Sequence, residues 1–100
     1  MSNEQLAKLT QSQRDRLAFV ELRVHFIGEI RRQDLVMRFG IQTAAASRDL
    51  ALYKELAPGN IDYDSKAKTY VLGPAFRAVF DFPPGRVLSW LTQGFGDGEP

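Results

Sequence analysis

The chain has 100 residues, of which 44% are hydrophobic and 25% are charged, and its formal net charge is +1. This length and composition fit one globular domain with a modest core rather than two complete domains. No apolar run is long enough to span a membrane, and residues 1–10 lack the apolar stretch of a signal peptide. The absence of cysteine excludes disulfides, thiolate zinc sites and cysteine nucleophiles, and it suits a reducing, cytoplasmic location.

The first predicted elements are a polar arm and a long helix. Residues 1–12 are expected to form a frayed end or a short helical arm. Thr10 or Ser12 is a suitable N-cap for a helix that runs to about Phe26 and stops at Gly28. This helix carries two apolar stripes, which consist of Leu17, Val20, Val24 and Ile27 and of Phe19, Leu22 and Phe26. Two stripes indicate a central helix covered on both sides, or a helix that also meets a second subunit.

Two further helices follow a connection at residues 29–31, which is too short for more than a tight turn or a brief strand. The first covers residues 33–39 and ends at Gly40, which we expect to adopt a positive φ. The second runs from Ala44 to about Leu56, with Thr43 as its expected N-cap. Its predicted inward face consists of Ala46, Leu50 and Tyr53.

The hydrophobic pattern then changes from helical spacing to alternation, which predicts a β-hairpin over residues 61–72 with a polar loop at 65–68. Residues 74–93 are interpreted as a C-terminal extension with a short helix that could contact a second subunit, and the glycine-rich residues 94–100 as a linker. The predicted fold class is mainly α with a small β-hairpin. It is a winged helix-turn-helix within residues 13–73.

This order of elements is typical of DNA-binding domains, in which one helix enters the major groove while another braces it. Residues 31–54 contain five basic and two acidic residues, and this local positive excess can face phosphates although the total charge is near zero. Base contacts are predicted for Thr43, Ala44, Ser47 and Arg48, with Arg48 suited to a bidentate contact with guanine. Phosphate contacts are predicted for Arg32, Gln42, Lys54, Lys66 and Lys68.

Each of these features also has a purely structural interpretation. Gly40 before a helix of small residues is common at helix–helix corners, and Arg48 could simply pair with Asp49 or Glu55. The candidate dimer contacts are Phe19, Leu22, Phe26, Phe80 and Trp90. They could instead be core residues, with the C-terminal aromatic side chains folded back over the first long helix. The alternative function is a winged-helix interaction or dimerisation module without DNA binding, which the near-zero net charge favours.

Catalytic and metal-binding functions are not indicated by the sequence. His25 is the only histidine, so no histidine pair can hold a metal ion. The acidic pairs Asp62/Asp64 and Asp97/Glu99 have neither a partner base nor a phosphate-binding loop beside them. We therefore predict no catalytic residue, no metal ligand and no cofactor.

Several segments between residues 16 and 71 resemble the N-terminal winged helix-turn-helix domain of WYL-domain transcriptional regulators, in particular the group that represses bacterial anti-phage defence operons. The segments that carry this resemblance are residues 16–23, 28–30, 34–35, 38–41, 46–50, 55–60 and 63–70, with Arg32 and Tyr53. The resemblance implies a homodimeric repressor bound to double-stranded DNA at an inverted-repeat operator. In that family the helix with the Ser47-Arg48-Asp49 motif enters the major groove.

Family members continue into a ligand-sensing WYL domain and a dimerisation domain. This chain ends in a glycine-rich tail where the WYL domain would begin, so we interpret it as a single domain of such a protein or as a natural short form. No effector site is expected within it.

Overall fold

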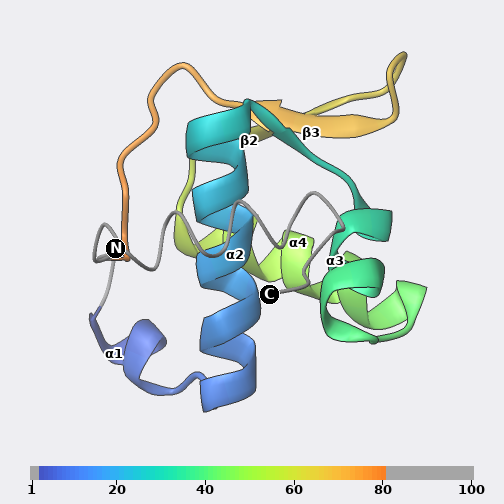
Figure 1. Cartoon of the computed structure of the whole chain (residues 1–100). Coiled ribbons are helices and arrows are strands. Elements are labelled where there is room, and N and C mark those ends of the chain that lie inside the picture. The colour runs from blue at the N-terminus through green and yellow to red at the C-terminus, as the bar shows by residue number, and fades with distance from the viewer. Residues whose placement is uncertain (1–2, 81–100) are drawn as a thin grey trace.

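The computed structural model describes residues 3–80, which form four helices and a three-stranded sheet. The elements are α1 (Asn3–Ala7), α2 (Gln11–Ile27), β1 (Glu29–Ile30), α3 (Arg32–Phe39), α4 (Thr43–Leu56), β2 (Ile61–Asp64) and β3 (Thr69–Leu72). The long helix α2 stands at the centre, α4 crosses it, and the sheet lies across the C-terminal end of α2 (Figure 1). The predicted fold class, a mainly helical winged helix-turn-helix, is confirmed.

Local capping chemistry sets the helix ends. The Thr10 hydroxyl accepts from the Gln13 backbone N–H at 3.0 Å while the Gln13 side chain accepts from the Thr10 N–H at 2.9 Å, so a capping box starts α2. Gly28 (φ 99°) and Gly40 (φ 67°) adopt the left-handed conformation that ends α2 and α3. The prediction that Thr43 is the N-cap of α4 is wrong. Gln42 has the extended conformation of an N-cap residue, and Thr43 is the first residue of the helix.

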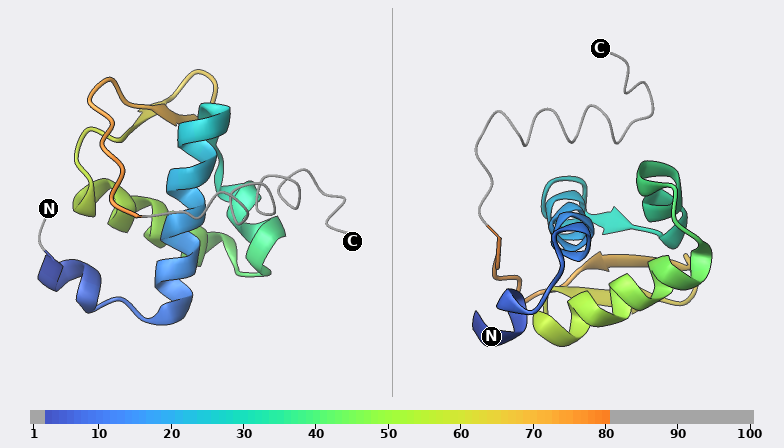
Figure 2. Two further views of the ribbon diagram at one scale, coloured as in Figure 1. Left: turned by 60° about the vertical axis from the view of Figure 1, so that its left-hand side comes forward. Right: turned by 90° about the horizontal axis from the view of Figure 1, so that it is seen from below.

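The sheet joins the hairpin to the connection between α2 and α3. Its order is β1-β3-β2 with antiparallel pairing, so β3 is the central strand. In this register Ile30 lies opposite Tyr70, and Tyr70 also lies opposite Tyr63. The tip of the β2–β3 hairpin projects on the side of the molecule where α3 and the start of α4 lie (Figures 1 and 2).

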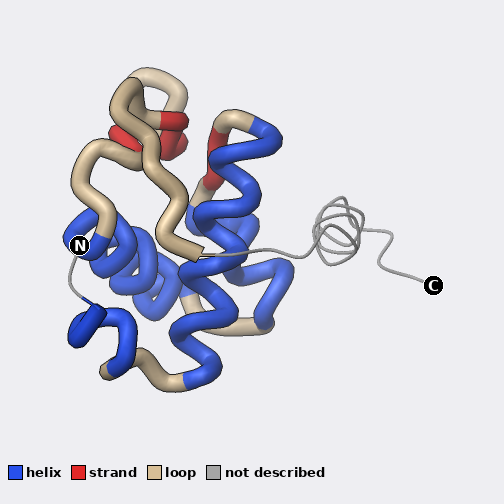
Figure 3. The backbone as a smooth tube through the Cα atoms, turned by 90° about the vertical axis from the view of Figure 1, so that its left-hand side faces the viewer, coloured by secondary structure: helices blue, strands red, loops and turns tan. Residues whose placement is uncertain are grey.

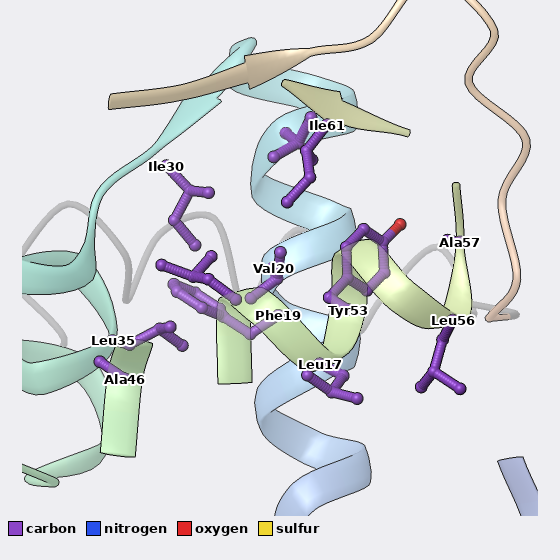
Figure 4. Packing of buried hydrophobic residues seen from close by; sticks show 12 residues of the cluster. Leu17, Phe19, Val20, Ile30, Leu35, Ala46, Tyr53, Leu56, Ala57 and Ile61 are labelled. Atoms are coloured by element: carbon purple, nitrogen blue, oxygen red, sulfur yellow. The ribbon is translucent and has the colours of Figure 1, made fainter. Parts of the chain in front are cut away.

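Most residues of both apolar stripes of α2 belong to the core, whereas Phe26 is exposed. Figure 4 shows the side chains of α2, α4 and the strands meeting in one cluster. Phe19 and Leu22 are 1% and 0% exposed, and the ring of Phe19 packs edge-on against Phe39. The prediction that these two residues form a dimer contact is therefore wrong. Elements of the same chain, α3, α4, β1 and β3, all pack against the central helix.

After β3 the chain turns back, and residues 73–80 run alongside the helices on the side away from the hairpin tip (Figures 1 and 3). Phe80 is half-buried against the core, as the alternative of a folded-back segment predicts, whereas Phe26 is 51% exposed. Trp90, the predicted short helix and the predicted linker lie outside the described residues. No helix within residues 3–80 is both long enough and apolar enough to cross a membrane.

Candidate nucleic-acid interface

The helix α4 has one buried and one open face. Ala46, Asp49, Leu50, Tyr53 and Leu56 are buried on the side toward the core. On the opposite side Thr43, Ala44 and Arg48 are exposed and Ser47 is partly exposed. The four residues predicted to contact bases therefore share one accessible surface on the N-terminal half of the helix.

Arg48 is available for an external partner. Asp49, its neighbour in the sequence, is engaged by Arg16 of α2, whose Nε lies 2.6 Å from Oδ2 and whose Nη2 lies 3.3 Å from Oδ1. The alternative pairing of Arg48 with Asp49 is therefore wrong, and within residues 3–80 Arg48 makes no ion pair with Glu55 either. As far as the described residues go, its guanidinium therefore keeps its donors for a base edge or a phosphate.

Arg32 and Ser47 were predicted to contact different parts of DNA, and the structure brings them together. Nη1 of Arg32, at the first residue of α3, donates to Oγ of Ser47 at 3.3 Å. Arg32 is exposed, so its remaining N–H donors still face outward. The contact places a cation beside the open face of α4, at the junction of the two helices.

The first turn of α4 adds backbone donors to this surface. Gln42 is the N-cap residue, and its side chain makes no capping hydrogen bond. The first N–H groups of a helix have no partner within the helix, and the helix dipole makes this end attractive to anions. Gln42 and Thr43 are both exposed, so a phosphate group could reach these donors.

The hairpin tip presents two lysines within a turn built by an aspartate. Oδ1 of Asp64 accepts from the backbone N–H groups of Lys66 and Ala67 at 3.0 and 3.1 Å, and Lys68 adopts a positive φ of 55°. Lys66 and Lys68 are exposed, but so are Asp62 and Asp64. The hairpin therefore offers two cations at its tip without carrying a net positive charge.

Lys54 does not join this cluster directly. It is exposed in the last turn of α4, six residues beyond Arg48, which corresponds to about 9 Å along the helix axis. Such a spacing lets it contact a more distant phosphate of a duplex that lies along α4.

Sequence reasoning missed the side chains that hold α4 in place. The ion pair between Arg16 and Asp49 was not predicted, although a charged residue at a buried helical position needs a partner. Glu21 was also missed: it lies within the run Val20–Leu22 of the central helix and is completely buried. A carboxylate inside an apolar run is the feature that could have indicated a polar site in the core.

A helix-turn-helix with an open second helix, a cation at the helix junction and a hairpin wing defines the winged helix-turn-helix class of domain. Within that class, the chain belongs to the family described as the BrxR transcriptional regulator winged helix-turn-helix domain, which it matches over residues 12–93.

The chain is similar to proteins named DNA-binding transcriptional repressor CapW from three sources. It is 40% identical over 81 residues to the protein of Pseudomonas aeruginosa, covering 81% of this chain and 26% of that protein. It is 35% identical over 79 residues to the protein of Stenotrophomonas maltophilia, covering 79% and 26%. For the protein of Escherichia coli strain KTE188 the values are 38% over 68 residues, with 68% and 23% covered. The chain thus spans about a quarter of the length of these curated relatives.

Proposed function

We propose that this chain binds double-stranded DNA in a sequence-specific manner as the DNA-binding domain of a cytoplasmic transcriptional repressor. The observation that carries the proposal is the exposed surface around Arg48 on α4. Within residues 3–80 Arg48 makes no ion pair, because the carboxylate of the adjacent Asp49 is fixed to Arg16 of α2. Membership of a family of regulator domains and similarity to proteins named as DNA-binding repressors support it.

In this proposal the N-terminal half of α4 lies in the major groove. Arg48 contacts a guanine, and Thr43, Ala44 and Ser47 allow close approach to neighbouring base edges. The phosphate contacts come from Arg32 and Gln42 beside the helix start, from Lys54 at its far end and from Lys66 and Lys68 on the wing. Two copies of the domain bind the two halves of an inverted repeat, with the half-sites about one helical turn of DNA apart.

The experiment that tests this proposal is a titration with two duplexes, one selected from a random-sequence pool by the protein and one unselected. Arg48→Ala should weaken the selected duplex by about 5- to 150-fold, because a bidentate contact discriminates by roughly 1–3 kcal/mol, and should weaken the unselected duplex much less. Arg77→Ala is the matched control, because Arg77 is exposed on the segment away from the hairpin tip. Equal losses on both duplexes would contradict the assignment of Arg48.

A protein-interaction module without DNA binding is the second candidate. Four large apolar side chains are exposed within the described residues: Phe26, Met37, Tyr63 and Leu72. Exposed apolar groups can serve as contacts between protein chains. Absence of binding to any duplex at low salt, together with concentration-dependent self-association in sedimentation, would favour this second function over DNA binding.

A further inference from the structure

Glu21 holds the backbone of a segment that is distant in sequence. Its carboxylate is completely buried in the middle of α2. Oε1 accepts from the Val79 N–H at 2.8 Å and from the Tyr53 hydroxyl at 2.8 Å, and Oε2 accepts from the Phe80 N–H at 2.9 Å. Burial of a carboxylate is costly unless donors surround it, and here two of the three donors come from residues 79 and 80.

Asn60 holds the same segment two residues earlier. Its Oδ1 accepts from the Arg77 N–H at 2.9 Å, and its Nδ2 donates to the Arg77 carbonyl at 2.7 Å. The side-chain amide thus pairs with one residue of backbone as a neighbouring β-strand would. Nδ2 also donates to the Tyr53 hydroxyl at 2.9 Å, which joins Asn60 to Glu21 in one network.

The network recognises backbone rather than side chains. Each hydrogen bond to the segment uses an N–H or C=O group of residues 77, 79 and 80, while the side chains of Arg77 and Ala78 are exposed. Val79 and Phe80 add half-buried apolar contact against the core. The site therefore fits an extended chain with an apolar end.

Tyr53 connects this site to the proposed DNA-binding helix. It is completely buried on α4, five residues after Arg48, and its hydroxyl is turned away from Phe19 and Val20 (Figure 4). The open N-terminal half of α4 lies at the other end of the helix, on the side of the hairpin tip (Figures 1 and 2). One rigid helix thus links the two sites.

We propose that Glu21, Tyr53 and Asn60 form a docking site for the backbone of residues 77–80, and that occupancy of this site couples the path of the chain after Phe80 to the placement of α4. Without the segment, the buried carboxylate would lose two of its three donors, so undocking of the segment is disfavoured. Any contact that pulls residues 77–80 out of this site would then change the placement of α4. The coupling part of this inference rests on the proposed DNA-binding function.

The docking part is tested by backbone amide hydrogen exchange on the whole chain, measured by NMR. Glu21→Gln places an NH₂ group where one acceptor oxygen stood and should lower the protection of the Val79 or Phe80 amide at least tenfold. Val79→Pro removes one donor without changing the core carboxylate and should lower the protection of Phe80 to a similar degree. Ala78→Pro is the matched control, because within the described residues the Ala78 N–H donates to no group, and it should leave Phe80 protected. Unchanged Phe80 protection in Val79→Pro would overturn the docking site.

The coupling part is tested on the same variants with the selected duplex. Val79→Pro should increase exchange around Tyr53 and weaken binding of the duplex by about three- to tenfold, while Ala78→Pro matches the wild type. Lost protection at Phe80 with unchanged exchange at Tyr53 and unchanged DNA affinity would overturn the coupling. If the wild-type chain binds no duplex, the proposed function fails, and the exchange rates at Tyr53 still decide whether the segment acts on α4.

Discussion

Arg16 binds Asp49 across the interface of α2 and α4, with 2.6 Å between Nε and Oδ2. The side chains are 19% and 6% exposed, so the ion pair is largely buried, and it lies one residue from the exposed Arg48. The pair therefore fixes which side of α4 faces outward.

Replacement of only one residue of the Arg16–Asp49 pair should lower the free energy of unfolding more than replacement of both. Arg16→Met leaves the Asp49 carboxylate buried without its cation and should lower the free energy of unfolding by about 3 kcal/mol. The double variant Arg16→Met/Asp49→Leu should recover most of that loss, because an apolar pair carries no desolvation cost. Urea unfolding of the three proteins measures both values. A single variant within about 0.5 kcal/mol of the wild type would show that the pair does not hold α4.

The wing lysines should contribute to affinity without sequence discrimination. Lys66→Ala should weaken the selected and the unselected duplex to the same extent, and it should reduce the slope of log K against log salt by about one unit. Lys8→Ala is the control, because Lys8 is exposed in the connection between α1 and α2. A loss confined to the selected duplex would instead indicate that the wing reads bases.

Gly73 should tolerate no side chain, because its backbone touches the turn after α4. A Cβ at this position would lie 2.0 Å from the carbonyl oxygen of Gly59, and the Gly73 N–H already donates to the Asn60 carbonyl at 2.8 Å. Gly73→Ala should therefore cost about 3 kcal/mol of stability, the upper part of the usual range for overpacking. Gly40→Ala meets no atom within 4 Å and should cost only the strain of its positive φ, about 1 kcal/mol. Equal losses in thermal or urea unfolding would contradict the close approach.

Glu21 should make stability depend on pH. Burial raises the pKa of Glu21 above its ordinary value of 4.5, and this exceeds the opposing effects of its backbone and Tyr53 donors and of His25. The native state therefore holds the proton more tightly than the unfolded state, so the contribution of Glu21 to stability is greatest below about pH 4.5. It is lost as the pH rises through the raised pKa. Glu21→Gln should flatten the unfolding free energy in this window, measured in urea at several pH values. Parallel pH profiles for the two proteins would exclude this titration.

Leu22 and Phe26 should behave differently although both lie on one stripe of α2. Leu22→Ala should cost about 2–5 kcal/mol of stability, because Leu22 is completely buried. Phe26→Ala should cost much less, because half of that side chain is exposed, and any effect on self-association in sedimentation would come from Phe26 alone. If Leu22→Ala altered the oligomeric state at unchanged stability, the core assignment would be wrong.

Features determined by nearby residues could be predicted from the sequence. The stops at Gly28 and Gly40 follow from the chemistry of a few adjacent residues, and both are present in the structure. The cap of α2 was predicted at Thr10 or Ser12, and the structure has it at Thr10. The inward face of α4 follows from helical spacing alone, and Ala46, Leu50 and Tyr53 are all fully buried. The N-cap of α4 was displaced by one residue, because Gln42 and Thr43 can both occupy that position.

Features that depend on distant residues could not be predicted. The sequence left residues 29–31 as a tight turn or a brief strand, and only the pairing with Tyr70 and Val71, some forty residues later, decides for the strand Glu29–Ile30. Phe19 and Leu22 have the same spacing whether they face a second subunit or their own core. Likewise, Glu21 is tolerated only because the backbone of Val79 and Phe80 reaches it. For the interface, sequence indicated the open residues of α4 but not the Arg16 contact that orients them.

The order of the strands bears on how the protein behaves when it is crowded with other copies of itself. The unpaired N–H and C=O groups of an edge strand can pair with a strand of another molecule, which leads to aggregation or strand exchange. Here β1 has two residues, and β2 has four, of which Asp62 and Asp64 are exposed and negatively charged. Repulsion between these carboxylates and the shortness of both edge strands oppose such pairing. Asp62→Val, which leaves the turn made by Asp64 intact, should therefore make solutions turbid at concentrations where the natural chain stays clear.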